Sequence, residues 1–144
     1  MLIKITPADK AFGDCVKARV NWTCESCRTY YPESNRRGLH CSHFHGRGNW
    51  SIRLDPLNAF AHCFHCHMYF EANPHEFTVW ALEQMGQGAY DILLEKKNNT
   101  SLGKEYKRTK GKGEVAKHYR EEYKRIASGR GSGETGRIEF IGWI

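Results

Sequence analysis

Cysteine and histidine residues are concentrated in one stretch of this chain. Eleven of its fourteen Cys and His residues lie between Cys24 and His67. They form a Cys24-x-x-Cys27 pair, a His-Cys-Ser-His-Phe-His run over residues 40–45 and a His-Cys-Phe-His-Cys-His run over residues 62–67. Thiolates and imidazoles are the side chains that zinc and other transition metals prefer. The density predicts a metal site, and the division into groups favours two.

Two Cys-x-x-Cys corners are the strongest pattern in this stretch. Structural zinc takes four ligands in a tetrahedron, and two such corners separated by a loop can supply them. The four cysteines are Cys24, Cys27, Cys63 and Cys66. Thirty-five residues separate the two pairs, so this zinc frame would enclose a substantial element that contains His43. Cys15 and Cys41 lack the double spacing, and ordinary core or surface thiols are the simpler interpretation of them.

Length, composition and charge limit the class of protein. A chain of 144 residues with 40% apolar and 26% charged residues can form one small core with an appendage, but not two full cores. The N-terminal residues are too polar for a signal peptide or a membrane span, so we expect a cytoplasmic protein. In that reducing compartment, clustered cysteines bind metal more often than they form disulfides.

The charge is unevenly distributed along the chain. Residues 96–130 hold twelve Lys and Arg against four Glu, an excess of eight, whereas the whole chain carries +6. This basic segment is the expected contact with a polyanion. A solvated, disordered tail would have the same composition.

A strand pair is the expected element inside the zinc frame. Residues 39–44 favour one strand, and residues 50–54 alternate like its hairpin partner. Residues 46–49, Gly-Arg-Gly-Asn, would form the turn between them. Asp55-Pro56 would end the second strand and begin a turn or helix that carries Asn58 and the second Cys pair.

The clearest helix signal is an Asn-Pro-His-Glu sequence. Asn73 suits an N-cap, Pro74 the first helical position and Glu76 the third position after the cap, so we expect a helix from Pro74. Gly86-Gln87-Gly88 would interrupt it before a second helix over residues 89–97. Apolar residues recur in the first helix at helical spacing and should form core contacts: Phe77, Trp80, Ala81 and Met85.

The remaining segments are less decisive. Residues 12–19 fit either a short helix or an extended lead-in. Residues 98–113 have the composition of a linker, and residues 114–127 that of a basic helix. Residues 128–136 are rich in Gly and Ser and should be flexible, and residues 137–144 favour a strand that would need a partner edge.

Three residues resemble the HNH, or ββα-metal, nuclease motif. That motif places a histidine on the first strand, an asparagine in the connection and a histidine directly after the second Cys pair, as do His43, Asn58 and His67. The layout is also similar to the junction resolvase endonuclease VII, in which two Cys pairs bracket the catalytic hairpin. The resemblance implies an α+β fold, a small zinc-stabilised ββα-metal core over residues 1–97 that includes the following helices. Residues 98–144 would add a basic linker, helix and C-terminal strand.

A larger set of residues resembles the phage NinG recombination nucleases over residues 14–95. A weaker similarity continues in the basic segment 119–125. The matching residues are Asp14, Arg19, Cys24, Cys27, Ser42, His43, Phe44, Arg47, Arg53, Asp55, Pro56, Asn58, Asn73, Pro74, Glu76, Phe77 and Trp80.

The resemblance implies a metal-dependent DNA endonuclease and a role for each motif residue. Phosphodiester hydrolysis needs a water deprotonated near neutral pH, which a neutral histidine can do, and we assign this to His43. His67 would hold one divalent ion, magnesium or manganese. Asn58 would fix the loop so that His43 presents the correct ring nitrogen. Arg47 and Arg53 would bind the phosphate or its transition state.

Ser42 departs from the endonuclease VII pattern, which has an aspartate beside the general base. A neutral hydroxyl is a poor ligand for a hard cation. His67 would then be the only protein ligand of the catalytic ion, or His40 or His45 would help. Other histidines are expected at the surface: His62 and His65 beside the zinc, and His75 and His118 elsewhere.

The leading functional hypothesis is cleavage of branched DNA, such as four-way junctions or D-loops, in phage recombination within the cytoplasm of a host bacterium. A resolvase cuts opposing strands, so a homodimer joined through the tail or the terminal strand is possible. Two alternatives stay open: a zinc-dependent DNA-binding accessory module that does not cut, and a less selective HNH nuclease that cuts linear duplex equally well. The expected DNA-backbone contacts are Arg36, Arg37, Lys117, Arg120, Lys124 and Arg125.

Overall fold

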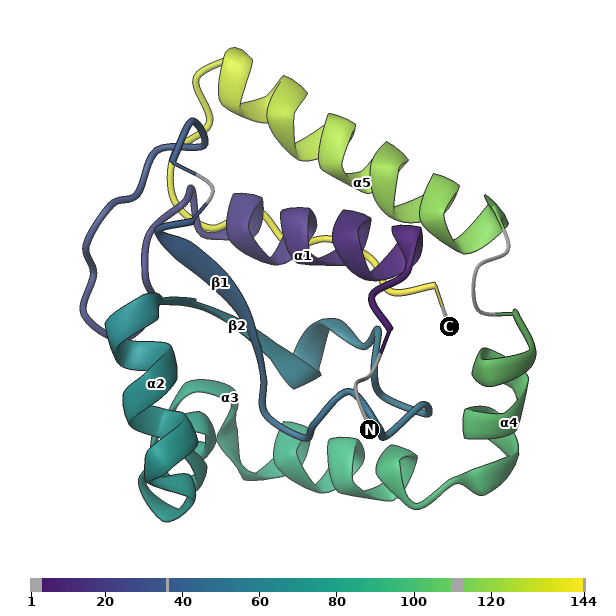
Figure 1. Ribbon diagram of the computed structural model, residues 1–144. Helices are drawn as coiled ribbons and strands as arrows, with labels where there is room; N and C mark the ends of the chain where they lie inside the picture. Colours follow the sequence, from purple (N-terminus) through teal and green to yellow (C-terminus); the bar gives the residue numbers. More distant parts are fainter. Residues whose placement is uncertain (1–3, 36, 110–112, 144) are drawn as a thin grey trace.

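The computed structural model describes residues 4–35, 37–109 and 113–143 (Figure 1). Within these ranges the chain is a mixed α and β protein with a two-stranded sheet. Figure 1 shows α5 lying on α1 on one side of the sheet, with α2 and α3 on the other. None of the described helices is long and apolar enough to cross a membrane. In chain order the elements are α1 (Pro7–Arg19), β1 (Leu39–His43), the 3-10 helix η1 (Pro56–Asn58), β2 (Ala59–Cys63), α2 (Phe64–Ala72), α3 (Pro74–Lys97), α4 (Thr100–Thr109) and α5 (Gly113–Gly131).

Helix α1 decides the open question at residues 12–19 in favour of a helix. It begins with a capping box, in which the Thr6 side chain accepts from the Asp9 backbone N–H and the Asp9 carboxylate accepts from the Thr6 N–H. Pro7 fits the first turn, where its missing N–H costs no hydrogen bond. The inner face of the helix buries Phe12 and Val16 against the sheet and α5.

The predicted hairpin partner of the first strand is wrong. β1 pairs in antiparallel register with β2, with Leu39 opposite Cys63 and His43 opposite Ala59. Residues 50–54 instead follow a series of turns, closed by backbone hydrogen bonds such as the one from the Asp55 N–H to the Ile52 carbonyl. The loop that joins the strands therefore extends from residue 44 to residue 58.

Arg53 anchors this loop to α1. Its guanidinium, 1% exposed, donates from Nε and Nη2 to both carboxylate oxygens of Asp9 at 2.9 and 2.7 Å, and it lies 4.1 Å from the Trp50 ring centre. Burial by itself raises the pKa of Asp9, but hydrogen bonds from Arg53 and Thr6 outweigh it and hold that pKa below its ordinary value. The alternation that suggested a strand thus reflects a buried ion pair within a compact loop.

Helix α3 begins at Pro74 as predicted, and Gly86 interrupts it with a non-helical φ of 82°. Phe77 and Ala81 are buried, and Trp80 and Met85 pack beside them, which confirms the predicted apolar face. This second core lies between the sheet and the helices α2 and α3.

His62 is buried in this second core, so its predicted exposure is wrong. Its ring lies 4.8 Å from that of Trp80 and 5.1 Å from that of Phe70, centre to centre, and neither ring nitrogen has a hydrogen-bond partner among the described residues. Burial, with a smaller contribution from His67, lowers the pKa of His62 to about 3. His65, by contrast, is exposed as expected.

Replacing His62 with leucine should stabilise the protein, because the variant no longer buries two unpaired nitrogens. The gain should be about 1 kcal/mol at pH 7. A pKa lowered by folding makes stability fall as pH drops from about 6.5 toward 3, since the unfolded chain gains the proton first. The advantage of His62→Leu should therefore grow by roughly 1–2 kcal/mol at pH 5. Urea unfolding at both pH values tests this, with His75→Leu on exposed α3 surface as the control; equal pH dependence in native and His62→Leu proteins would contradict it.

The C-terminal third contains two corrections. Residues 100–109 form α4 rather than a linker, because Tyr106 is buried and Leu102 packs against the main core. Residues 137–143 are extended but do not form a strand: the Ile138 N–H donates to the Arg19 carbonyl, and Phe140 is buried. The segment expected to offer a dimer edge is thus packed against its own chain.

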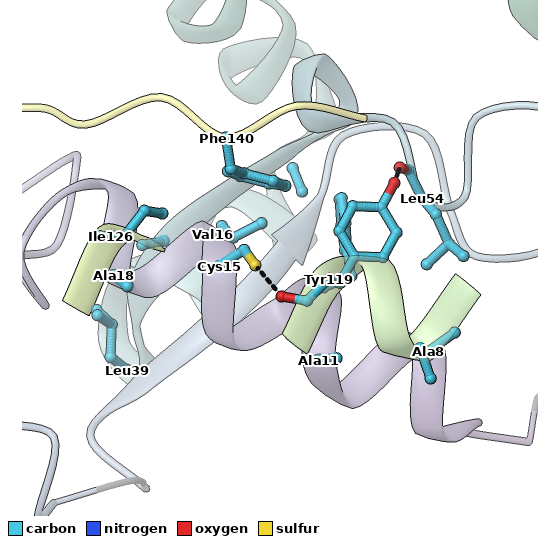
Figure 2. Packing of buried hydrophobic residues seen from close by; sticks show 14 of the residues in the cluster. Ala8, Ala11, Cys15, Val16, Ala18, Leu39, Leu54, Tyr119, Ile126 and Phe140 are labelled. Atoms are coloured by element: carbon cyan, nitrogen blue, oxygen red, sulfur yellow. Dashed lines mark hydrogen bonds between the residues drawn. The ribbon is translucent and has the colours of Figure 1, made fainter. Parts of the chain in front are cut away.

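Helix α5 confirms the predicted basic helix and extends it to Gly131. Figure 2 shows Tyr119 of this helix between Phe140 and Leu54, with its hydroxyl donating to the Leu54 carbonyl at 2.7 Å. The Cys15 thiol donates to the Tyr119 carbonyl at 3.1 Å. Residues from both 1–97 and 98–144 thereby share one buried cluster.

Candidate functional site

The four cysteines of the predicted zinc frame lie together. Their sulfur atoms are all within 4.8 Å of one another, and within the described part of the chain they form the only such group of three or more Cys, His, Asp or Glu ligand atoms. Four thiolates at this spacing could hold a structural metal such as zinc. The members are Cys24, Cys27, Cys63 and Cys66.

Local geometry brings each pair to the site. The first pair lies in a turn after α1, where Arg28 has a positive φ and the backbone bridge between Thr23 and Tyr30 closes the loop. Cys63 ends β2 and caps α2, because its sulfur accepts from the Cys66 N–H at 3.4 Å. The cysteine frame therefore connects the turn after α1 to the junction between β2 and α2.

The ionisation of Cys27 suits a metal ligand. A hydrogen bond with Thr29 is the main cause that lowers the pKa of Cys27 to about 6, so its thiolate is favoured at neutral pH. Cys15 is buried in the main core and Cys41 packs against it. Both cysteines are packing residues, as predicted.

His43 ends β1 and has a defined tautomer. Its Nε2 lies 2.9 Å from the Arg53 carbonyl oxygen, which can only accept, so Nε2 carries the hydrogen and Nδ1 keeps its lone pair. Burial, and then the positive charge of Arg47, lower the pKa of His43 to about 4. The ring is therefore neutral at pH 7, with its basic nitrogen at Nδ1.

Asn58 fixes the loop that holds His43. Its buried side chain accepts from the His45 N–H at 2.8 Å and donates to the His45 and Ile52 carbonyls at 2.9 and 3.1 Å. These bonds close the two ends of the loop. Arg53, the residue after Ile52, supplies the carbonyl that orients His43. Asn58 therefore positions that histidine indirectly.

His43 and His67 face one cavity. It has a volume of about 380 Å³ and lies between the end of β1, α2 and α3. Ser42 and His45 also line it, and the Ser42 hydroxyl is buried without a partner among the described residues. The structure thus brings both motif histidines to the same solvent-connected space.

Glu71 also lines this cavity, and sequence reasoning missed it. It lies one helical turn after His67 on α2, and its negative charge opposes the effects of burial and of His40 that together lower the pKa of His67. The signal was available as the His67-x-x-x-Glu71 spacing in a predicted turn or helix. Glu71 adds an anionic oxygen donor to a cavity in which Ser42 offers only a hydroxyl.

The two arginines assigned to phosphate binding differ sharply. Arg47 is half-buried, and its positive charge contributes to the lowered pKa of both His43 and His67. Arg53 is buried and fully engaged with Asp9 and backbone carbonyls, so it is a structural residue and not a phosphate ligand. Asp9 lies in the N-terminal helix, outside the motif, so the pairing was not visible in the motif itself.

The predicted DNA contacts lie on two separate surfaces. Arg37 is exposed beside His40, and Arg36 lies outside the described residues. The other four contacts are exposed on α5, which covers the α1 side of the sheet, whereas the cavity lies on the α2 and α3 side (Figure 1). Arg125 is engaged by Glu122 at 2.9 Å and by the Glu139 carbonyl. The other three predicted contacts on that helix are Lys117, Arg120 and Lys124.

Comparisons of the chain with models of protein families, with curated proteins and with solved structures found no match.

Proposed function

We propose that this chain is a metal-dependent DNA endonuclease of the HNH class. The observation that carries the proposal is the pairing of His43 and His67 across one cavity, with His43 held neutral and its Nδ1 available. The loop geometry adds support, because Asn58 donates to the Ile52 carbonyl, next to the Arg53 carbonyl that sets this tautomer. The placement of His43, Asn58 and His67 around one loop and one cavity therefore supports the proposal.

The chain would promote hydrolysis through four side chains. His43 Nδ1 would take the proton from the attacking water. Arg47 would bind the phosphate oxygens, and neutralisation of its charge by the phosphate would raise the pKa of His43 toward the working pH. His67 and Glu71 would hold the divalent ion, and their imidazole and carboxylate donors suit magnesium or manganese. When bound, the ion would neutralise charge on the phosphate and on the leaving oxygen.

Glu71→Gln should weaken binding of the catalytic ion. It should not unfold the protein, because Glu71 is exposed. The magnesium concentration for half-maximal cleavage should rise by roughly tenfold or more, since even residues that only support a metal ligand often contribute that much. A magnesium titration of single-turnover cleavage measures the shift. Glu83→Gln, at an exposed carboxylate on α3, is the matched control. An unchanged titration in Glu71→Gln would remove Glu71 from the ligand set.

The proposed substrate is branched recombination DNA, a four-way junction or D-loop. This part rests on the resemblance to the NinG and endonuclease VII nucleases. The placement of basic residues is compatible with it, because arms of a branched substrate can reach both the cavity side and the α5 side of the molecule.

The test is cleavage of a labelled four-way junction and of linear duplex of the same sequence, in magnesium and in manganese. Junction-selective cutting is the expected result. Equal cutting of both DNAs would keep the nuclease and remove the branched specificity. Binding without cutting would favour a zinc-dependent accessory module, whose supporting observation is the exposed basic face of α5 together with the cysteine frame.

A further inference from the structure

His67 is the end of a chain of hydrogen-bonding groups. The Arg37 carbonyl oxygen lies 3.1 Å from Nε2 of His40, and Nδ1 of His40 lies 3.1 Å from Nδ1 of His67. The two imidazole rings are nearly perpendicular, at 89°. Both distances fit hydrogen bonds between nitrogen and an acceptor.

When both rings are neutral, the acceptor at one end fixes every proton in the chain. A carbonyl oxygen can only accept, so Nε2 of His40 must carry a hydrogen. The neutral ring then has a lone pair at Nδ1, and a hydrogen bond to that lone pair requires His67 to donate from its own Nδ1. The lone pair of His67 is left on Nε2, which has no hydrogen bond among the described residues.

The surroundings hold this arrangement in place. His40 lies on β1 opposite His62, and its ring packs edge-on against Phe64 at 5.9 Å between ring centres. The tautomer applies to the neutral pair, because a second proton on His40 would reverse the hydrogen bond between the two rings.

We propose that His40 is a positioning residue that fixes the Nδ1–H tautomer of His67 and so presents Nε2 of His67 to the divalent ion in the cavity. The assignment of the tautomer stands on hydrogen bonding alone, whereas the ligand role rests on the proposed nuclease function. Metal-binding histidines commonly donate their other ring N–H to an acceptor, which orients the ring and raises its basicity. In this chain a second histidine, itself fixed by a backbone carbonyl, is that acceptor.

The tautomer can be measured directly in the metal-free protein, without DNA. Long-range ¹H–¹⁵N spectra distinguish a protonated from an unprotonated ring nitrogen, and native His67 should be protonated at Nδ1. His40→Phe keeps a ring of similar shape against Phe64 but removes the acceptor, so His67 should lose its fixed Nδ1–H form. His40→Asn offers an amide oxygen near the original Nδ1 and should retain it. Protonation of native His67 at Nε2, or an unchanged spectrum in His40→Phe, would overturn the inference.

Manganese affinity, followed by electron paramagnetic resonance, tests the ligand role. His40→Phe should weaken binding by about tenfold or more, and His40→Asn should recover most of the loss. His65→Ala, at an exposed histidine on the same helix, should bind as the native protein does. Equal losses in the two His40 variants, no loss in either, or no binding by the native protein would overturn the ligand role. Failure of the proposed function would look different: manganese would bind and His67 would have the expected tautomer, but no DNA would be cut.

Discussion

His43→Gln should lower the single-turnover rate of DNA cleavage by about 10²- to 10⁴-fold, the usual contribution of a general base. The glutamine amide can still donate to the Arg53 carbonyl and preserve the loop, but it has no basic nitrogen for the attacking water. Zinc content, thermal unfolding and DNA affinity should stay close to those of the native protein. The loss would then belong to the chemical step.

A second variant separates the base from the loop that carries it. Asn58→Ala removes the contacts to His45 and Ile52, so it should lower both the cleavage rate and the stability of the protein. His43→Gln should lower the rate alone. Cleavage by His43→Gln at the native rate would show that His43 is not the general base, which is the central element of the proposed mechanism.

Features encoded by neighbouring residues were predictable from the sequence. Helix α3 starts at Pro74, which suits the first helical position although the Asn73 side chain makes no capping hydrogen bond, and it breaks at Gly86, which has a positive φ. The cysteine frame was predictable for a different reason: the spacing within each pair is itself the requirement of the metal. The choice of Asn58 and His67 as site residues came from the resemblance to the HNH motif, and His67 lies on the same cavity as His43.

Features set by distant partners were not predictable. Residues 50–54 alternate like a strand, but the loop conformation and the burial of Arg53 depend on its ion pair with Asp9, forty-four residues away. The wrong strand partner also led to the wrong exposure for His62. The true partner of β1 is β2, which places His62 in the buried core and not at the surface. Glu71 is a different case: its helical spacing from His67 was visible, but only the shared cavity connects it with His43.

Cys63→Ser should cost the protein its bound zinc and its cooperative fold. Structural zinc contributes about 10–16 kcal/mol in small zinc-dependent domains, which equals or exceeds the whole stability of a typical domain. Cys63 is the central member of the frame: its sulfur lies 3.8 Å from that of Cys27 and accepts from the Cys66 N–H. Zinc stoichiometry and thermal unfolding by circular dichroism measure the loss. Cys41→Ala removes a thiol outside the frame and should keep the zinc, with a stability cost of about 1–2 kcal/mol.

The two proposed metal roles can be tested separately, although the cysteine frame and the cavity meet on α2. Cys66 and His67 are adjacent in the first turn of that helix, and Glu71 follows one turn later. Loss of the frame should therefore displace His67 and Glu71 and abolish cleavage because the protein unfolds, whereas His43→Gln should slow cleavage in a folded protein. Zinc returned to chelated native protein should restore the fold, and magnesium alone should not. A cooperative, zinc-free Cys63→Ser protein that still cut DNA would show that the cysteines do not hold the structure together.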